Sequence, residues 1–256
     1  MTAEQKKQMA LFLDIAGDYL RDGYKRVREE YRFSDDFSYT PAVGSVQLAE
    51  SAEPVPRVQN TDSLETIAAE IRGCSRCGLH APRAQAVPGE GVKRPLAMVI
   101  GDAPDGGDTA AGRPFSGEAG ALLDKMLGSV RLFRERNCFI TNLAKCSPPG
   151  DRDVLPDEAA VCAEYLIRQM NRLKPAVILS LGRISARFFL NTGEEFGKIR
   201  GVFAEYRGFP LLATYHPRDL LADGDLKRPV WEDLKALRSK LMELDEHYAL
   251  EIREGG

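Results

Sequence analysis

Residues 96–104 read LAMVIGDAP, five apolar residues that run into Gly, Asp, Ala and Pro. Short apolar runs of the same kind recur at 138–141, 176–180 and 211–214. Stretches with helical periodicity lie between and around them, at 117–130, 157–173, 185–190 and 229–244. Fully apolar short strands that alternate with helices are typical of a parallel sheet covered on both faces. We therefore expect an α/β fold, a three-layer α/β/α domain around a central, mainly parallel four-stranded sheet.

Side chains that could take part in binding or catalysis follow these predicted strands. Asp102 follows the first strand, Asn142 the second and His216 the fourth, and Phe115 lies just downstream of the first. Because ligands of such sheets bind outside the carboxyl ends of the strands, we expect these residues to share one cleft. The set holds no Ser–His pair and no carboxylate cluster suited to Mg²⁺. It therefore fits recognition of a planar, polar heterocycle better than proteolysis or phosphoryl transfer.

The four side chains match the needs of one reaction. The amide of Asn142 can pair with the O4 and N3–H edge of uracil, and Phe115 offers a stacking face worth about 1–3 kcal/mol per base. A neutral His216 could donate to a departing base and Asp102 could position water, once the nucleotide is flipped out. Each residue also has a plainer interpretation. His216 could be a satisfied strand-end histidine, Asn142 a turn cap, Phe115 a core residue and Asp102 an N-cap, but their joint placement favours function.

Four of the five cysteines form a pattern with metal-ligand spacing. Cys74 and Cys77 make a Cys-x-x-Cys pair, and Cys146 and Cys162 supply two further soft ligands. The spacing leaves zinc and an iron-sulfur cluster both open. Cys138 lies in an apolar run and is interpreted as a small buried hydrophobe.

The rest of the chain suggests three parts. Residues 4–32 have the periodicity of an amphipathic helix and the following residues resemble a linker, so we separate 1–62 from a domain at 63–245 and an acidic tail at 246–256. The net charge of −3 argues against binding to nucleic acid by bulk attraction alone. No apolar run is long enough to span a membrane, and residues 1–7 are not signal-like. We expect a cytoplasmic location.

Taken together, the motifs resemble the family 4 uracil-DNA glycosylases, the iron-sulfur branch of the uracil-DNA glycosylase superfamily. The similarity covers roughly residues 64–241 and is carried by 101–104 with 112–120, 141–146 and 214–217. It implies that a 4Fe-4S cluster, structural in role, is held by Cys74, Cys77, Cys146 and Cys162. It also implies an enzyme that hydrolyses the N-glycosidic bond of uracil in single- or double-stranded DNA, in base excision repair.

The resemblance assigns roles residue by residue. Asn142 and Phe115 would recognise the base beside Gly101 and Ala103, and His216 would stabilise it as it leaves. Asp102 would handle water, with Asp108 as a second candidate. The implied DNA contacts are Arg113, Leu220, Leu221, Lys227 and Arg228.

The sequence departs from the family pattern in its first motif. The family usually has Glu at the position of Asp102 and Gly at that of Asp105. Two alternatives therefore stay open: a glycosylase with shifted specificity for other deaminated bases, and a catalytically weak protein that binds uracil-containing DNA. Residues 147–161 contain no His, which argues against the covalent DNA capture of a related branch. Residues 1–60 lie outside the resemblance and leave room for a protein partner.

Overall fold

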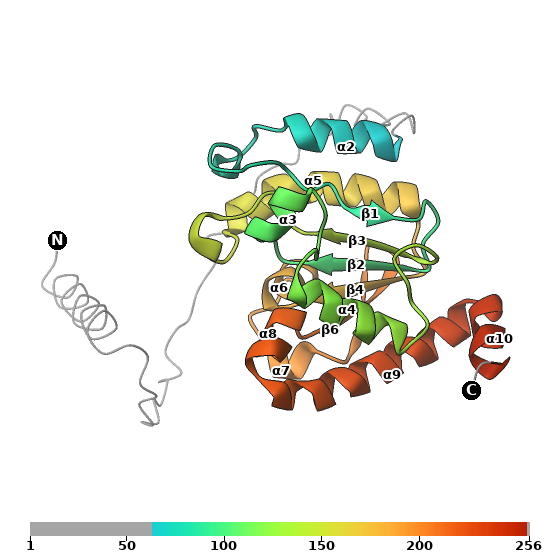
Figure 1. Cartoon of the computed structure of the whole chain (residues 1–256). Helices are drawn as coiled ribbons and strands as arrows, with labels where there is room; N and C mark the ends of the chain where they lie inside the picture. The colour runs from blue at the N-terminus through green and yellow to red at the C-terminus, as the bar shows by residue number, and fades with distance from the viewer. Residues whose placement is uncertain (1–62, 255–256) are drawn as a thin grey trace, which may run out of the picture. The chain divides into compact units, whose positions relative to one another are not determined.

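The structure, a computed structural model, describes residues 63–254, so the helix expected over 4–32 and its linker lie outside the described residues. The described residues form a six-stranded sheet in the order β1-β3-β2-β4-β6-β5 (Figure 1). The four central strands run parallel to one another, and β1 and β5 pair antiparallel at the two edges. The strands are β1 (Glu90–Gly91), β2 (Ala97–Gly101), β3 (Cys138–Asn142), β4 (Val177–Leu181), β5 (Phe203–Tyr206) and β6 (Phe209–Thr214).

Helices cover both faces of the sheet, as predicted for a three-layer α/β/α domain. In chain order the α-helices are α2 (Leu64–Gly73), α3 (Gly106–Ala111), α4 (Glu118–Gly128), α5 (Pro156–Leu173), α6 (Arg183–Leu190), α7 (Phe196–Ile199), α8 (Pro217–Ala222), α9 (Lys227–Leu244) and α10 (Glu246–Glu254). Short 3₁₀ turns lie at η1 (Gly78–His80), η2 (Pro149–Asp151) and η3 (Gly224–Leu226).

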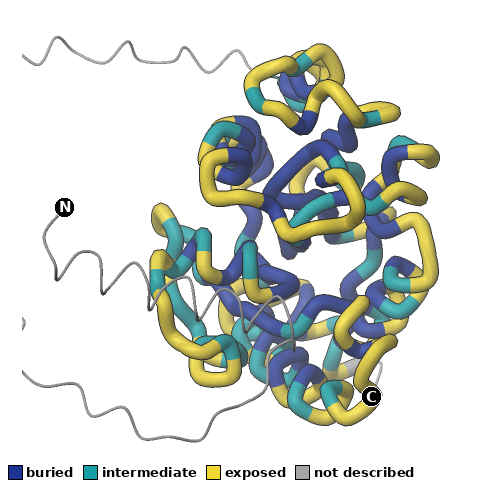
Figure 2. Tube along the Cα trace, turned by 90° about the vertical axis from the view of Figure 1, so that its left-hand side faces the viewer, coloured by how far each residue is buried: buried dark blue, intermediate teal, exposed yellow. Residues whose placement is uncertain are grey.

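The core consists of two apolar clusters, one on each face of the sheet. Met98 and Ile100 of β2 pack in the cluster that includes α2 and α5, whereas Ala97 and Val99 pack in the one that includes α4 and α9. Successive side chains of a strand point to opposite faces, so every residue of this strand is buried. Figure 2 shows these buried segments in the interior, with exposed residues on the outer loops and helix surfaces. This burial on both faces explains the fully apolar sequence of β2.

The prediction of four strands is wrong in number, because the two edge strands carry weak signals. β1 is two residues long, and β5 is mostly half-exposed with a mixed sequence, so neither shows an apolar run. β5 and β6 form a hairpin whose turn residues, Arg207 and Gly208, have φ of 52° and 86°. Positive φ at both positions is typical of a two-residue hairpin turn. The predicted strand 211–214 therefore begins two residues earlier, at Phe209.

The C-terminal end also differs from the sequence-based expectation. Much of the predicted acidic tail, 246–256, is the helix α10, which begins directly after α9. Tyr248 and Ala249 are buried, and the Tyr248 hydroxyl donates to the carbonyl of Val130. These residues belong to the folded domain because their apolar side is covered. No helix among residues 63–254 is long and apolar enough to cross a membrane.

Candidate active site

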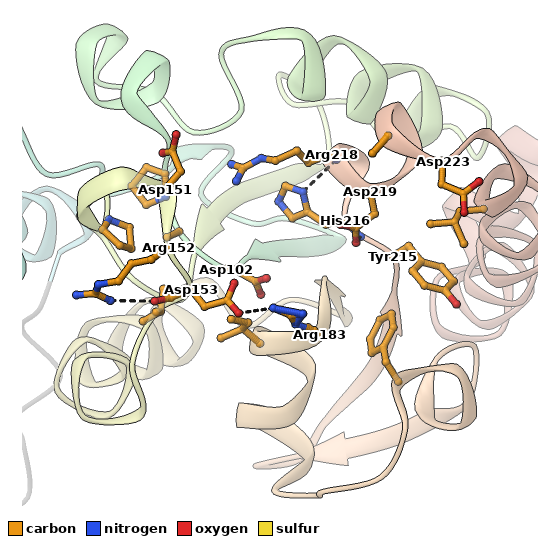
Figure 3. A pocket seen from close by; sticks show the side chains of 18 residues that line it. Asp102, Asp151, Arg152, Asp153, Arg183, Tyr215, His216, Arg218, Asp219 and Asp223 are labelled. Atoms are coloured by element: carbon orange, nitrogen blue, oxygen red, sulfur yellow. Dashed lines mark hydrogen bonds and ion pairs between the residues drawn. The ribbon is translucent and has the colours of Figure 1, made fainter. Parts of the chain in front are cut away.

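A cleft of about 550 Å³ opens at the carboxyl ends of the parallel strands (Figure 3). We call it the strand-end cleft. It brings together Asp102 and Ala103 after β2, His216 after β6, and the first residue of α6, Arg183. The sequence-based prediction that polar residues after separate strands share one cleft is therefore met for Asp102 and His216. The lining also includes Pro104, Pro148, Asp151, Arg152, Asp153, Val154, Ile184, Phe196, Tyr215, Arg218, Asp219, Ala222, Asp223 and Leu226.

Asp102 is held at the start of helix α6. Its Oδ1 accepts a hydrogen bond of 2.7 Å from the backbone N–H of Ser185. The carboxylate also lies against Gly182, where a Cβ atom would stand 2.6 Å from Oδ2. Burial raises the pKa of Asp102 to about 6, and the hydrogen bonds from Ser185 act in the opposite direction. Near neutral pH this carboxyl group is thus mostly ionised but close enough to its pKa to exchange a proton.

His216 is the N-cap residue of α8, and its ring is buried and neutral. Nδ1 accepts a hydrogen bond of 3.1 Å from the backbone N–H of Arg218. Burial, and next the charge of Arg218, lower the pKa of His216 to about 4. A neutral ring whose Nδ1 accepts must carry its proton on Nε2. His216 can therefore donate one hydrogen bond from Nε2 without bringing a positive charge.

Asn142 and Phe115 lie behind the cleft and do not line it. Asn142 ends β3 with 1% of its surface exposed, and neither its amide nitrogen nor its oxygen has a partner within the described part of the chain. Gly101 separates the two side chains: a Cβ there would stand 2.3 Å from Asn142 Oδ1 and 2.6 Å from Phe115 Cζ. The ring of Phe115 stacks beside that of His216, with centroids 5.3 Å apart. The four predicted residues thus gather around the end of β2.

The loop that carries Phe115 is fixed by buried polar contacts. Asp108 accepts hydrogen bonds from the backbone N–H and the hydroxyl of Ser116, at 2.7 and 2.9 Å. Arg134 donates to the carbonyls of Pro114 and Phe115 at 2.9 and 3.0 Å. Asp108 is buried and does not line the cleft. Its expected role as a second carboxylate for water therefore gives way to a structural one, because its acceptor capacity holds the turn after Phe115.

Of the five predicted DNA contacts, one is buried in the core, and the other four are exposed. Leu220 is 2% exposed and packs in the core, so it cannot act as a wedge between bases, whereas its neighbour Leu221 is 43% exposed. Arg113 pairs with Glu90 through two hydrogen bonds of 2.8 and 3.1 Å. Lys227 and Arg228 are exposed in the first turn of α9.

Three arginines line the cleft, and two of them, Arg183 and Arg218, were not predicted from the sequence. Arg152 pairs with Glu158, Arg183 with Asp153, and Arg218 lies 3.7 Å from Asp105. Arg183 directly follows β4 and its Gly182, and Arg218 comes two residues after His216. The rule that residues after parallel strands face the ligand would have identified both.

The four patterned cysteines line one small cavity together with Arg83 and Lys145. Cys74 caps the end of α2, Cys77 precedes η1, Cys146 follows β3 and Cys162 lies in α5. Burial raises the pKa of the Cys162 thiol to about 11 and raises that of Cys146, while the nearby cations Lys145 and Arg83 act in the opposite direction. Cys138 lies elsewhere, buried in the sheet, as predicted.

The cysteine cavity does not have the geometry of a site for a single ion. Among residues 63–254, no three His, Cys, Asp or Glu side chains converge closely enough to hold one metal ion. A single zinc ion would need its sulfur ligands at about 2.3 Å from one point. The four thiols line one cavity, but they do not converge on one position within it.

Comparisons with known proteins agree with this arrangement. Residues 88–235 match the family model described as the uracil DNA glycosylase superfamily. The type-4 uracil-DNA glycosylase of Saccharolobus solfataricus is 38% identical over 196 residues, which cover 72% of this chain and 91% of that protein. Those of Sulfurisphaera tokodaii and Archaeoglobus fulgidus are each 37% identical, covering 76% and 69% of this chain and 92% of either relative.

Proposed function

Because the chain belongs to the uracil DNA glycosylase superfamily and groups with its type-4 members, we propose that it excises uracil from DNA by hydrolysing the N-glycosidic bond. The observation that carries the proposal is the buried amide of Asn142, whose nitrogen and oxygen have no partner within the described part of the chain. A buried polar group without a partner is costly, so it indicates a ligand that completes its hydrogen bonds.

Uracil fits this amide. Its N3–H can donate to Asn142 Oδ1, and its O4 can accept from Nδ2. Phe115, fixed by the contacts of its loop, would stack on the base, while Gly101 leaves room because it has no side chain. The base can reach Asn142 only if it is flipped out of the strand and enters past the cleft lining.

The bond between C1′ and N1 breaks with the electron pair moving onto the base. The Nε2–H of neutral His216 can donate to the O2 of the leaving base, where negative charge develops. Asp102 can orient a water molecule toward C1′ and accept its proton. The water oxygen then becomes the new hydroxyl on the sugar. This division of roles requires Asp102 ionised and His216 neutral, which their pKa values of about 6 and about 4 allow at neutral pH.

A uracil-release assay on single- and double-stranded oligonucleotides tests the proposal. Asn142→Ala should lower release at least about 100-fold, since it removes the group that reads the base. Tyr248→Phe is the matched control, because it removes one buried hydrogen bond far from the cleft. Equal activity of Asn142→Ala and the wild type would reject the assignment. A panel with hypoxanthine and xanthine tests the alternative specificity, and tight binding without release would indicate a binding protein.

We also propose that Cys74, Cys77, Cys146 and Cys162 hold a 4Fe-4S cluster. A cubane cluster presents four separate irons, each with its own thiolate, so its ligands surround a common cavity instead of converging on one ion. All four thiols line one cavity, which is the arrangement that such a cluster requires. When bound, the cluster would tie the end of α2 to β3 and α5. Iron and sulfide analysis of the purified protein tests this, and a colourless protein with zinc would reject it.

DNA would approach from the side of the strand-end cleft. Leu221, Lys227 and Arg228 are exposed, and the cleft adds Arg183 and Arg218. We assign Leu221 to the gap left by the flipped base and the cations to phosphates. Residues 1–60 precede the matched region, and we propose that they bind a protein partner. We also propose that the enzyme acts in the cytoplasm.

A further inference from the structure

Lys145 is a fully buried lysine between the two sites described above. Its side chain is 1% exposed, and Nζ donates to Thr141 Oγ1 at 2.6 Å, to the carbonyl of Asn142 at 2.8 Å and to Gln169 Oε1 at 2.9 Å. All three acceptors are neutral. No carboxylate of residues 63–254 pairs with this ammonium group. Three hydrogen bonds satisfy its donors, and a buried lysine without an acidic partner is rare.

The same residue contacts the cysteine cavity. Lys145 lines it, and its backbone N–H donates to Cys162 Sγ at 3.2 Å. It also directly precedes Cys146, whose Sγ accepts a hydrogen bond of 3.1 Å from Arg83. Thiols become thiolates when they bind metal, so an occupied cavity carries negative charge. That charge would lie beside the ammonium group that the rest of the protein leaves uncompensated.

On its other side Lys145 holds the strand end that reads the base. Its Nζ bonds the carbonyl of Asn142 and the hydroxyl of Thr141, the last two residues of β3. Gln169, the third acceptor, donates in turn to the carbonyl of Pro88 at 2.8 Å. Lys145 thus holds the backbone of the residue whose side-chain amide would read the base.

We propose that Lys145 is a positioning residue that couples the cysteine cavity to base recognition: it is the charge partner of the thiolate-bound cluster and holds the end of β3 that carries Asn142. The inference rests on the proposed cluster and extends it. Loss of the cluster leaves a buried charge without compensation, so the network around Asn142 loosens and uracil is bound less well.

Lys145→Met tests the proposal, since methionine keeps the length and apolar volume but removes the charge. In the iron-loaded protein, this variant should lose iron to a chelator about 10- to 100-fold faster than the wild type, as for other outer contacts of metal sites. The KM for uracil-containing DNA should rise more than kcat falls. Tyr248→Phe, the control for a lost buried hydrogen bond, should match the wild type in both. Wild-type iron retention by Lys145→Met, or equal iron loss by both variants, would overturn the proposal.

Gln169→Glu is the second variant, for the case that Lys145→Met does not fold. It supplies Lys145 with a carboxylate partner inside the protein. The cluster should then stabilise the protein less, so the difference in Tm between the iron-loaded and the iron-free protein should become smaller. An unchanged difference would overturn the proposal. The iron content of the wild type separates the failure of the two proposals. A wild type without iron rejects the cluster itself. A wild type that contains iron, with variants that behave as the wild type does, rejects only the role of Lys145.

Discussion

Asp102→Asn should make the protein more stable at neutral pH while it removes most of its activity. Burial raises the pKa of Asp102 to about 6 from its usual value of 3.8, so the ionised form is disfavoured in the folded state. Two pKa units at about 1.36 kcal/mol each give a cost of up to about 3 kcal/mol at pH 7. This cost is fully present above pH 6 and is relieved as the pH falls toward 3.8. Asparagine has no charge to bury and avoids it.

The stability effect can be measured as a difference in Tm. For a domain of this size about 1 kcal/mol corresponds to about 2–4 °C, so Asp102→Asn should raise Tm by up to about 10 °C at pH 7. The gain should largely disappear at pH 4. Asp108→Asn is the matched control, and its effect on Tm should be opposite. The Asp108 carboxylate accepts two hydrogen bonds from Ser116, and these offset the cost of its burial. The substitution should lower Tm.

The activity effect follows from the same pKa. Wild-type kcat/KM should fall with acid, to about one-tenth of its plateau one unit below the pKa of Asp102. His216, with a pKa of about 4, stays neutral from pH 5 to 8 and should not contribute. Asp102→Asn should release uracil about 10²- to 10⁴-fold more slowly, with a flat pH profile. The reasoning fails if the variant is less stable than the wild type at pH 7, or if it keeps the acid limb.

Four further substitutions probe other parts of the structure. Gly120→Ala should lower kcat/KM by about 100-fold with an unchanged circular dichroism spectrum, because the new Cβ would stand 1.8 Å from the Phe115 carbonyl and displace the stacking ring. Leu220→Ala should cost about 2–5 kcal/mol in denaturant unfolding. Leu221→Ala should stay within about 0.5 kcal/mol of the wild type but weaken binding to uracil-containing duplex, and equal effects of the two leucines would contradict the assignment. Cys146→Ser should lower the iron content per chain and the Tm together, and a variant with full iron content would exclude this ligand.

Much of the candidate site was predictable because it follows from local pattern and one geometric rule. Asp102 and His216 come directly after apolar runs, and the carboxyl ends of parallel strands meet at one edge of a sheet. The edge strands β1 and β5 were not predictable in this way, because they pair with neighbours through the backbone and have no apolar pattern of their own. These two segments form strands because they pair with β3 and β6, respectively.

Residues with similar sequence signals also acquired different roles through packing. Asp102 and Asp108 both lie between β2 and α4, but one faces the cleft and the other, in α3, bonds Ser116. Leu220 and Leu221 are adjacent, and the turn of α8 buries the first and exposes the second. Sequence spacing could not separate the members of either pair.

The sequence by itself determined the order of the four parallel strands and of the longer helices, the polar residues that follow three of these strands and the four cysteines, because these depend on periodicity and residue type along the chain. Only the tertiary structure decided which carboxylate has a raised pKa, which histidine nitrogen donates, and that Lys145 lies between the cysteine cavity and Asn142. The physical reason is that burial and hydrogen bonding come from residues distant in sequence. Ser185 bonds Asp102 from 83 positions away, and Gln169 bonds Lys145 from 24.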